Sequence, residues 1–148
     1  MKGKKTDLGS ADCAIARSLD LIGDWWSLLI VRDAFQGKER FGEFQTGLGL
    51  AKNILSTRLK KLVSEGIFKM LPESEGSSRS RYVLTPKGER LCVLLAALWQ
   101  WGEESCFRPG ELKRTLVDVN SRKPLARLEL RSQDGRRVGP RGFTLAKR

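Results

Sequence analysis

Residues 51–86 decide the fold, and they read AKNILSTRLKKLVSEGIFKMLPESEGSSRSRYVLTP. The first part carries leucines at helical spacing and predicts a helix over residues 51–65. Two short strands are expected next, Ile67–Leu71 and Arg81–Leu84, on either side of a long polar hairpin tip. Pro86 then lies in the first turn of a further long helix, where proline loses no hydrogen bond. Helix, hairpin and helix in this order indicate a winged helix-turn-helix.

The chain before residue 51 supplies three more predicted helices. Asp12 is the expected cap of a helix over Cys13–Ile22, and Asp24 is the expected cap of a helix over Trp25–Phe35. A short helix that contains Phe41 follows. Together with the hairpin, these elements predict an α+β, mainly helical domain.

Composition limits the kind of function. The chain has 148 residues and a formal net charge of +11, which favours a polyanionic partner such as nucleic acid or an anionic membrane surface. It contains no histidine, so histidine-based catalysis and histidine-containing metal sites are excluded. The three cysteines Cys13, Cys92 and Cys106 are far apart and form no Cys-x-x-Cys pair. We therefore expect no enzyme, no cofactor and no metal.

The positive charge divides the chain unevenly. Residues 106–148 carry a net charge of +8, whereas residues 1–105 carry only +3. We expect a flexible basic N-terminus over residues 1–11, a DNA-binding and dimerisation domain over 12–105, and a small β-hairpin extension over 106–148. The arms of this hairpin are predicted at Leu116–Val119 and Ala126–Arg131, and Asp134-Gly135 marks another turn.

The polar face of the helix over residues 51–65 suits the major groove of DNA. Asparagine can read adenine edges, lysine can reach guanine or phosphate, and hydroxyl groups can bond to either. The alternative is a solvated helix face, but the preceding short helix and the following hairpin favour DNA reading. Arg58 lies at the edge of the buried stripe, where it can contact phosphate or an internal acid such as Glu43. The DNA-reading candidates are Lys52, Asn53, Ser56, Thr57, Arg58, Lys60 and Lys61.

Basic side chains also flank this helix. Arg79 and Arg81 of the hairpin are expected to contact the minor groove or phosphates, although Glu73 and Glu75 would oppose this. Lys38 and Arg40 precede the short helix, where backbone contacts are common in such folds. For Lys38 and Arg40, the alternative is plain surface charge without a DNA contact.

The last predicted helix is apolar on almost every face. Either it pairs with a second copy or the extension packs over it, and pairing is favoured because two DNA half-sites need a two-fold protein. The first helix is expected to join that interface. The candidate interface residues are Ile15, Leu19, Leu91, Leu94, Leu95, Leu98, Trp99 and Trp101.

Cys13 is a candidate redox sensor. If Asp12 caps the helix, the thiol lies in the first turn, where the helix dipole favours the reactive thiolate. The alternative is an inert small residue. Cys92 is expected to be structural because it lies within an apolar helix, and Cys106 is a weaker second candidate.

Four stretches carry a resemblance to a known family. They are the run Cys13–Asp33, the motif Arg40–Phe44, the helix core Leu55–Leu62 with Gly66-Ile67, and the run Tyr82–Gly88. Together they resemble the HxlR-type transcriptional regulators over about Cys13 to Gly102. The resemblance implies a dimeric bacterial winged-helix protein that pairs through its terminal helices and binds operator DNA as repressor or activator.

The resemblance also bears on regulation. In some members a cysteine at the position of Cys13 senses oxidants or electrophiles, although Ala14 stands here where many members have proline. Small-molecule effectors are left open. The basic extension lies outside the shared motifs.

The expected function is therefore a homodimeric, sequence-specific regulator that binds double-stranded operator DNA. The alternative is an RNA-binding or protein-docking winged helix that uses the basic extension. The longest apolar stretch, Leu91–Trp101, is about half a membrane span, and no signal peptide follows Met1. A cytoplasmic protein without a membrane partner is expected.

Overall fold

A computed structural model of the chain describes residues 7–147. The first six residues of the basic N-terminus expected over 1–11 lie outside the described residues. The chain divides into two compact units, Met1–Leu95 and Ala96–Arg148. No helix among residues 7–147 is long and apolar enough to cross a membrane.

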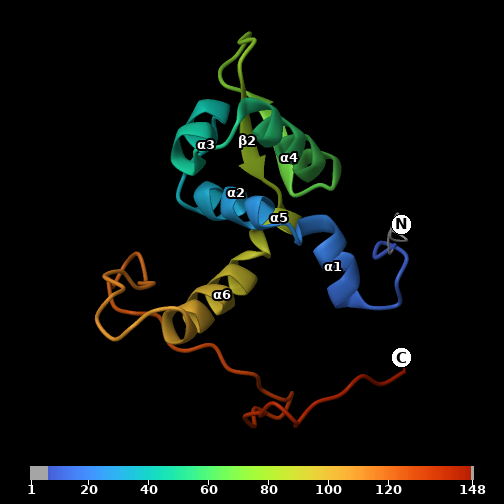
Figure 1. Cartoon of the computed structure of the whole chain (residues 1–148), viewed down its shortest axis with the longest axis vertical. Coiled ribbons are helices and arrows are strands. Elements are labelled where there is room, and N and C mark those ends of the chain that lie inside the picture. Colours follow the sequence, from blue (N-terminus) through green and yellow to red (C-terminus); the bar gives the residue numbers. More distant parts are fainter. Residues whose placement is uncertain (1–6, 148) are drawn as a thin grey trace, which may run out of the picture. The chain divides into compact units, whose positions relative to one another are not determined.

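Four helices begin the first unit (Figure 1). Their bounds are Ala14–Ile22 for α1, Trp25–Phe35 for α2, Phe41–Leu48 for α3 and Lys52–Ser64 for α4. The carboxylate of Asp24 caps α2 as expected, since it accepts the backbone N–H of Ser27 at 2.9 Å. Gly49 ends α3 with φ +65°, a conformation that glycine adopts without strain.

The cap of α1 differs from the sequence prediction. Cys13, not Asp12, is the N-cap residue, and its Sγ accepts the backbone N–H of Ala16 at 3.5 Å. The helix therefore starts one residue later, at Ala14, and the thiol lies at its very end instead of inside the first turn. The prediction was wrong because sulfur is a weak acceptor that cap preferences do not favour.

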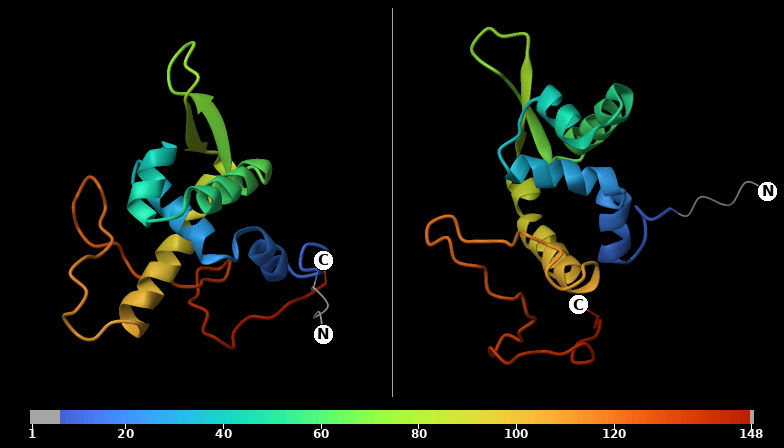
Figure 2. Two further views of the ribbon diagram at one scale, coloured as in Figure 1. Left: turned by 45° about the horizontal axis from the view of Figure 1, so that its top comes forward. Right: turned by 60° about the vertical axis from the view of Figure 1, so that its left-hand side comes forward.

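The wing is a two-stranded antiparallel hairpin (Figures 1 and 2). Strand β1 spans Phe68–Pro72 and β2 spans Ser80–Leu84, with Phe68 opposite Leu84 and Pro72 opposite Ser80. The polar tip between them extends away from the helices of this unit. The expected hairpin is thus confirmed to within one residue at each strand end.

The final helix is interrupted. Helix α5 spans only Pro86–Glu89, and α6 spans Cys92–Ser105. Thr85 caps α5 by accepting the N–H of Gly88. The N–H of Leu91 bonds to the Gly88 carbonyl three residues earlier, which tightens the turn and ends the first segment. The prediction of a single long helix was therefore wrong.

The core of the first unit lies between α2, α3, α4 and β1. The leucine stripe of α4 faces inward, and Leu55, Leu59 and Leu62 are fully buried. The rings of Phe44 and Phe68 meet edge to face, with centroids 6.2 Å apart. The buried stripe predicted from the spacing of the leucines is confirmed, and it turns the opposite face of α4 to solvent.

The extension folds differently from the predicted hairpin. Asp118 N–H bonds to the Lys123 carbonyl and Leu125 N–H to the Leu116 carbonyl, both at 2.9 Å. The first arm thus pairs with residues 123–125 and not with Ala126–Arg131, so the predicted register was wrong. A second turn follows at Asp134-Gly135, where Arg131 bridges to Arg137, as the turn prediction implies.

Ala126 and Leu128 have a partner that local pairing rules do not reveal. The side-chain amide of Gln100 on α6 donates to the Ala126 carbonyl at 3.0 Å and accepts the Leu128 N–H at 2.8 Å. A side-chain amide therefore takes the place of a neighbouring strand.

Candidate nucleic-acid interface

The outward face of α4 carries polar side chains that remain free for a ligand. Lys52, Asn53, Thr57 and Lys60 are exposed, and Ser56 is half-buried. Within residues 7–147, neither of the two lysines forms an ion pair. The Thr57 hydroxyl donates to the Asn53 carbonyl at 2.9 Å, which leaves its lone pairs available as acceptors. The structure therefore brings these five predicted residues together on one helix face.

Two predicted contacts on α4 face the protein instead. Lys61 Nζ donates to the Asp20 carbonyl at 2.7 Å, and Arg58 Nε lies 3.6 Å from Asp24 Oδ1. Burial raises the pKa of Asp24, but hydrogen bonds from Ser27 and the charges of Arg58 and Lys61 outweigh it and leave the pKa below its usual value. Both side chains thus attach α4 to the end of α1 and the start of α2.

Arg58 contacts an internal acid, which was one of its two expected roles, but the acid is Asp24 and not the suggested Glu43. Glu43 instead closes the start of α3, where its carboxylate accepts the backbone N–H groups of Glu39 and Arg40, each at 2.9 Å. These bonds lower the pKa of Glu43. The first turn of a helix is a favourable place for a carboxylate, which explains the preference.

The arginines on the wing and beside it differ in their partners. Arg81 Nη1 lies 3.0 Å from Glu39 Oε2, and Arg40 Nη2 lies 2.5 Å from Glu73 Oε1. Arg79 at the hairpin tip is exposed and forms no ion pair within the described residues. Glu73 therefore pairs with Arg40 and, within the described residues, not with Arg79 or Arg81, the two arginines that it was expected to oppose.

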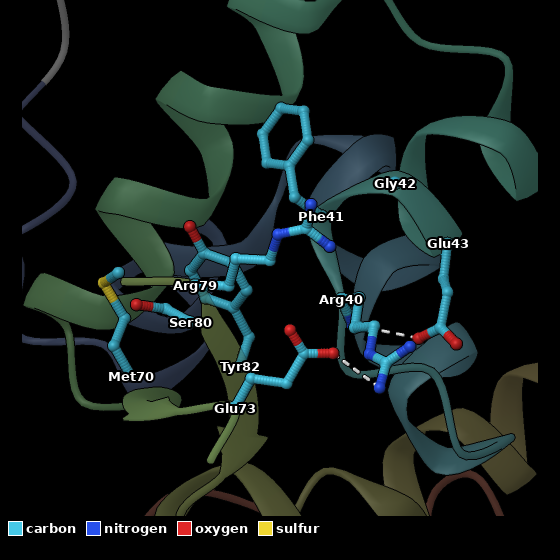
Figure 3. A pocket seen from close by; sticks show the side chains of 9 residues that line it. All are labelled: Arg40, Phe41, Gly42, Glu43, Met70, Glu73, Arg79, Ser80 and Tyr82. Carbon is cyan, nitrogen blue, oxygen red and sulfur yellow. Dashed lines mark hydrogen bonds and ion pairs between the residues drawn. The ribbon is translucent and has the colours of Figure 1, made fainter. Parts of the chain in front are cut away.

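An open hollow of about 640 Å³ separates the start of α3 from the wing. Figure 3 shows Arg40 between Glu43 and Glu73, with Arg79 and Tyr82 on the wing side of the hollow. Because its carboxylates and guanidinium groups largely compensate one another, the hollow offers less net positive charge than the outward face of α4.

Lys38 is bound to a buried carboxylate. Its Nζ lies 2.7 Å from Asp33 Oδ2, while Arg32 binds the other oxygen of Asp33 at 2.8 Å. Asp33 is only 1% exposed. A side chain at Gly47 would meet the same ammonium group, since an added Cβ would lie 2.1 Å from Lys38 Nζ. Lys38 therefore holds the α2–α3 turn, a role that sequence reasoning missed because Asp33 lies five residues earlier in a different element.

The residues predicted for a dimer interface separate into two groups. Leu94, Leu98 and Trp101 on α6 are exposed, as are Ile15 and Leu19 on α1. In contrast, Leu91 and Leu95 pack against the core of the first unit, and Trp99 is half-buried. The exposed group is the part available to a second copy.

The cysteines are all exposed thiols. The prediction that Cys92 is structural was wrong, because it occupies the first position of α6 and faces solvent. Within residues 7–147, no group of three or more acidic or cysteine side chains could hold a metal ion.

Comparison with known proteins agrees with this architecture. A family model described as HxlR-like helix-turn-helix matches residues 21–110. An HTH-type transcriptional regulator of Mycobacterium bovis, Mb3122, is 42% identical over 96 residues, which are 65% of this chain and 61% of the relative. The chain thus matches less than two thirds of the length of that relative.

Solved structures extend the likeness. The crystal structure of the transcription factor candidate PA1607 is 47% identical and superposes with a TM-score of 0.91, covering 97% of this chain and 100% of that one. The reduced form of the transcriptional regulator YodB from Bacillus subtilis is 27% identical with a TM-score of 0.56, covering 68% of this chain and 99% of that one. The likeness to PA1607 therefore includes the extension.

Proposed function

The chain belongs to the HxlR-like helix-turn-helix family of transcriptional regulators, and we propose that it binds specific operator DNA as a homodimer. The observation that carries the proposal is the outward face of α4, where Lys52, Asn53, Thr57 and Lys60 are exposed above a fully buried leucine stripe. An amphipathic helix of this kind fits the major groove.

Each side chain on this face has a distinct proposed role. Asn53 pairs with an adenine edge, and Lys60 reaches guanine or a phosphate. Lys52 is at the start of α4, where its ammonium group and the unpaired helix N–H groups both favour a phosphate. A good base contact of this type contributes about 1–3 kcal/mol of discrimination.

Dimerisation is proposed through the exposed apolar side chains of α1 and α6. Ile15 is 72% exposed and Trp101 is 61% exposed. On α6, the exposed Leu94, Leu98 and Trp101 recur at helical spacing and so form one apolar stripe, which is typical of an interaction surface. A two-fold dimer would present two copies of α4 to half-sites about one DNA turn apart.

Cys13 is the proposed redox-responsive group. Its exposed Sγ caps α1, so oxidation would change the group that accepts the backbone N–H of Ala16 at that helix end. This part of the proposal is tested by comparing Cys13→Ser with the unchanged protein before and after a mild oxidant. Loss of DNA binding in the unchanged protein alone would assign the response to Cys13, and equal loss in both would exclude it.

The central experiment measures binding of the reduced protein to its own upstream intergenic duplex. Scrambled duplex and RNA of matched length serve as competitors at physiological salt. A preference of about a thousandfold or more for the intergenic duplex is expected of specific regulation. Equal affinity for all three would instead favour the alternative, an RNA-binding or protein-docking module.

The double variant Thr57→Ala/Lys60→Ala assigns the preference to α4. It should remove most of the preference without unfolding the protein, because both side chains are exposed. Arg90→Ala is the matched control, since Arg90 is exposed outside α4 and forms no ion pair within the described residues. An unchanged preference in the double variant would place the reading surface elsewhere.

A further inference from the structure

We propose that residues 106–147 form a second polyanion-binding surface, which contacts the phosphate backbone of duplex DNA. Gln100 holds this surface in place. The choice of DNA as the polyanion rests on the proposed function. The starting observation is how this segment uses its charged side chains. Its acidic side chains form hydrogen bonds or ion pairs within the extension, whereas many of its basic side chains form no ion pair within the described residues.

The two aspartates of the extension build its turns. Asp118 accepts the backbone N–H groups of Asn120 and Ser121 at 3.0 and 2.6 Å. Asp134 accepts the backbone N–H of Arg136 at 3.1 Å and also binds the Ser132 hydroxyl. These bonds lower the pKa of both aspartates. Both carboxylates stay charged but face their own backbone. They therefore compete little with an incoming anion for the basic side chains.

The two glutamates are also occupied. Glu111 accepts the N–H of Arg108 at 2.8 Å. Glu129 binds both Arg131 and Arg137, the latter at 3.2 Å. Glu129 thus shares one negative charge between two arginines, which leaves a net charge of +1 on these three side chains.

The remaining cations face solvent without an acid. Within the described residues they are exposed and form no ion pair. They include Arg114, Arg122, Lys123, Arg136, Arg141 and Lys147. The excess charge of the extension is therefore presented to the outside, as a surface for a polyanion requires.

Gln100 gives this surface a fixed attachment to α6. Its side chain is almost buried, with 9% exposed, and its amide satisfies the backbone of Ala126 and Leu128 at once. Between these two residues, Arg127 forms ion pairs with Glu103 and Glu104, so its single positive charge offsets part of the negative charge of the last turn of α6. A fixed segment loses less conformational entropy when it binds than a free tail would.

The structure of the extension favours duplex phosphate over other polyanions. Binding to an anionic membrane usually uses an amphipathic helix, and residues 106–147 contain no helix. Binding to single-stranded nucleic acid uses aromatic stacking platforms, and the only aromatic residues of this segment are Phe107 and Phe143. Salt-dependent phosphate contacts need neither feature.

The test uses the full chain and random-sequence duplex over a range of salt concentrations. Arg114→Gln/Lys123→Gln/Arg136→Gln should lower the slope of log affinity against log salt by about 2–3, since each lost phosphate contact removes about 0.9. Arg90→Gln, which removes an exposed cation outside the extension, should change the slope by less than about 1. An unchanged slope in the triple variant would overturn the proposal.

Gln100→Leu tests the attachment without changing net charge. Trypsin should cut the extension faster in this variant, and affinity for random duplex should fall by about threefold or more as the ordering cost of one or more side chains returns. Faster cleavage with unchanged affinity would overturn the role of Gln100. Circular dichroism confirms that the helices persist.

The outcomes of these experiments also distinguish failure of this inference from failure of the proposed function. A slope change in the triple variant supports the second surface even if the intergenic duplex is not preferred over scrambled DNA, and in that case only the proposed function fails. If the triple variant instead loses binding only to vesicles with anionic lipid, or only to single-stranded RNA, the assignment to duplex DNA is overturned.

Discussion

The outward face of α4 and the wing both carry basic side chains, but they hold them in different states. Lys52 and Lys60 on α4 form no ion pair within residues 7–147, whereas Arg81 on the wing and Arg40 beside it, at the start of α3, are each bound to a glutamate. A free lysine gains the full interaction with a phosphate. A paired arginine must first give up a carboxylate, so its net gain is smaller.

Lys38 extends the comparison to a third state, a cation that holds the fold. Lys38→Met should lower the free energy of unfolding by about 3 kcal/mol, because Asp33 would remain buried with one carboxylate oxygen unpartnered. Lys60→Met, at an exposed position, should change it by less than about 0.5 kcal/mol. Urea denaturation of both variants measures the difference, and equal stability would contradict the structural role of Lys38.

Asn53 tests whether a free side chain on α4 reads DNA. Asn53→Ala should reduce the preference for the intergenic duplex by about 1–2 kcal/mol, the range of one good base contact. Affinity for scrambled duplex should hardly change, since the amide carries no charge. Competition binding measures both quantities, and a parallel loss for both duplexes would show that Asn53 contributes no base reading.

Asp24 tests the contacts that attach α4 to the rest of the domain. Because the pKa of Asp24 is lowered in the fold, its stabilisation is present above its ordinary pKa of about 3.9 and is lost as the pH falls through the lower folded value. In Asp24→Asn, this part of the acid dependence should disappear, a change of about 1 kcal/mol. Unfolding free energies at pH 6 and pH 2 measure it, and identical pH profiles would contradict the prediction.

The wing pair gives the smallest expected effect. Glu73→Gln should raise affinity for random duplex by about two- to threefold, because Arg40 no longer has to exchange a carboxylate for a phosphate. Glu75→Gln removes the same charge from an exposed wing residue without an ion pair in the described part of the chain, and it is the matched control. An equal gain in both variants would mean that only net charge matters.

The sequence predicted the winged helix well because its signals are local. The leucine spacing of α4, the Asp24 cap and the polar hairpin tip each act within a few residues, and all are present in the structure. The predicted N-cap of α1 was wrong by one residue. Cys13 provides the acceptor, and cysteine ranks low among the residues that usually cap helices.

The partners of the charged residues could not be predicted in the same way. Arg81 binds Glu39 across 42 positions, and Gln100 binds backbone 26 and 28 residues away. Such pairs depend on how elements meet in space and leave no periodic pattern in the chain. The composition therefore indicated an excess of basic side chains, but it could not show which of them form ion pairs within the protein.

The bond from Lys61 to the Asp20 carbonyl connects the last turn of α1 to the last turn of α4. By thermodynamic linkage, if a ligand bound at α4 changes the free energy of opening α1, then opening α1 must change the affinity for that ligand by the same amount. A ligand that holds α4 in its present position would therefore protect the last turn of α1 against opening. Conversely, opening of the last turn of α1 would lower the affinity for that ligand, and these two effects must be equal in free energy.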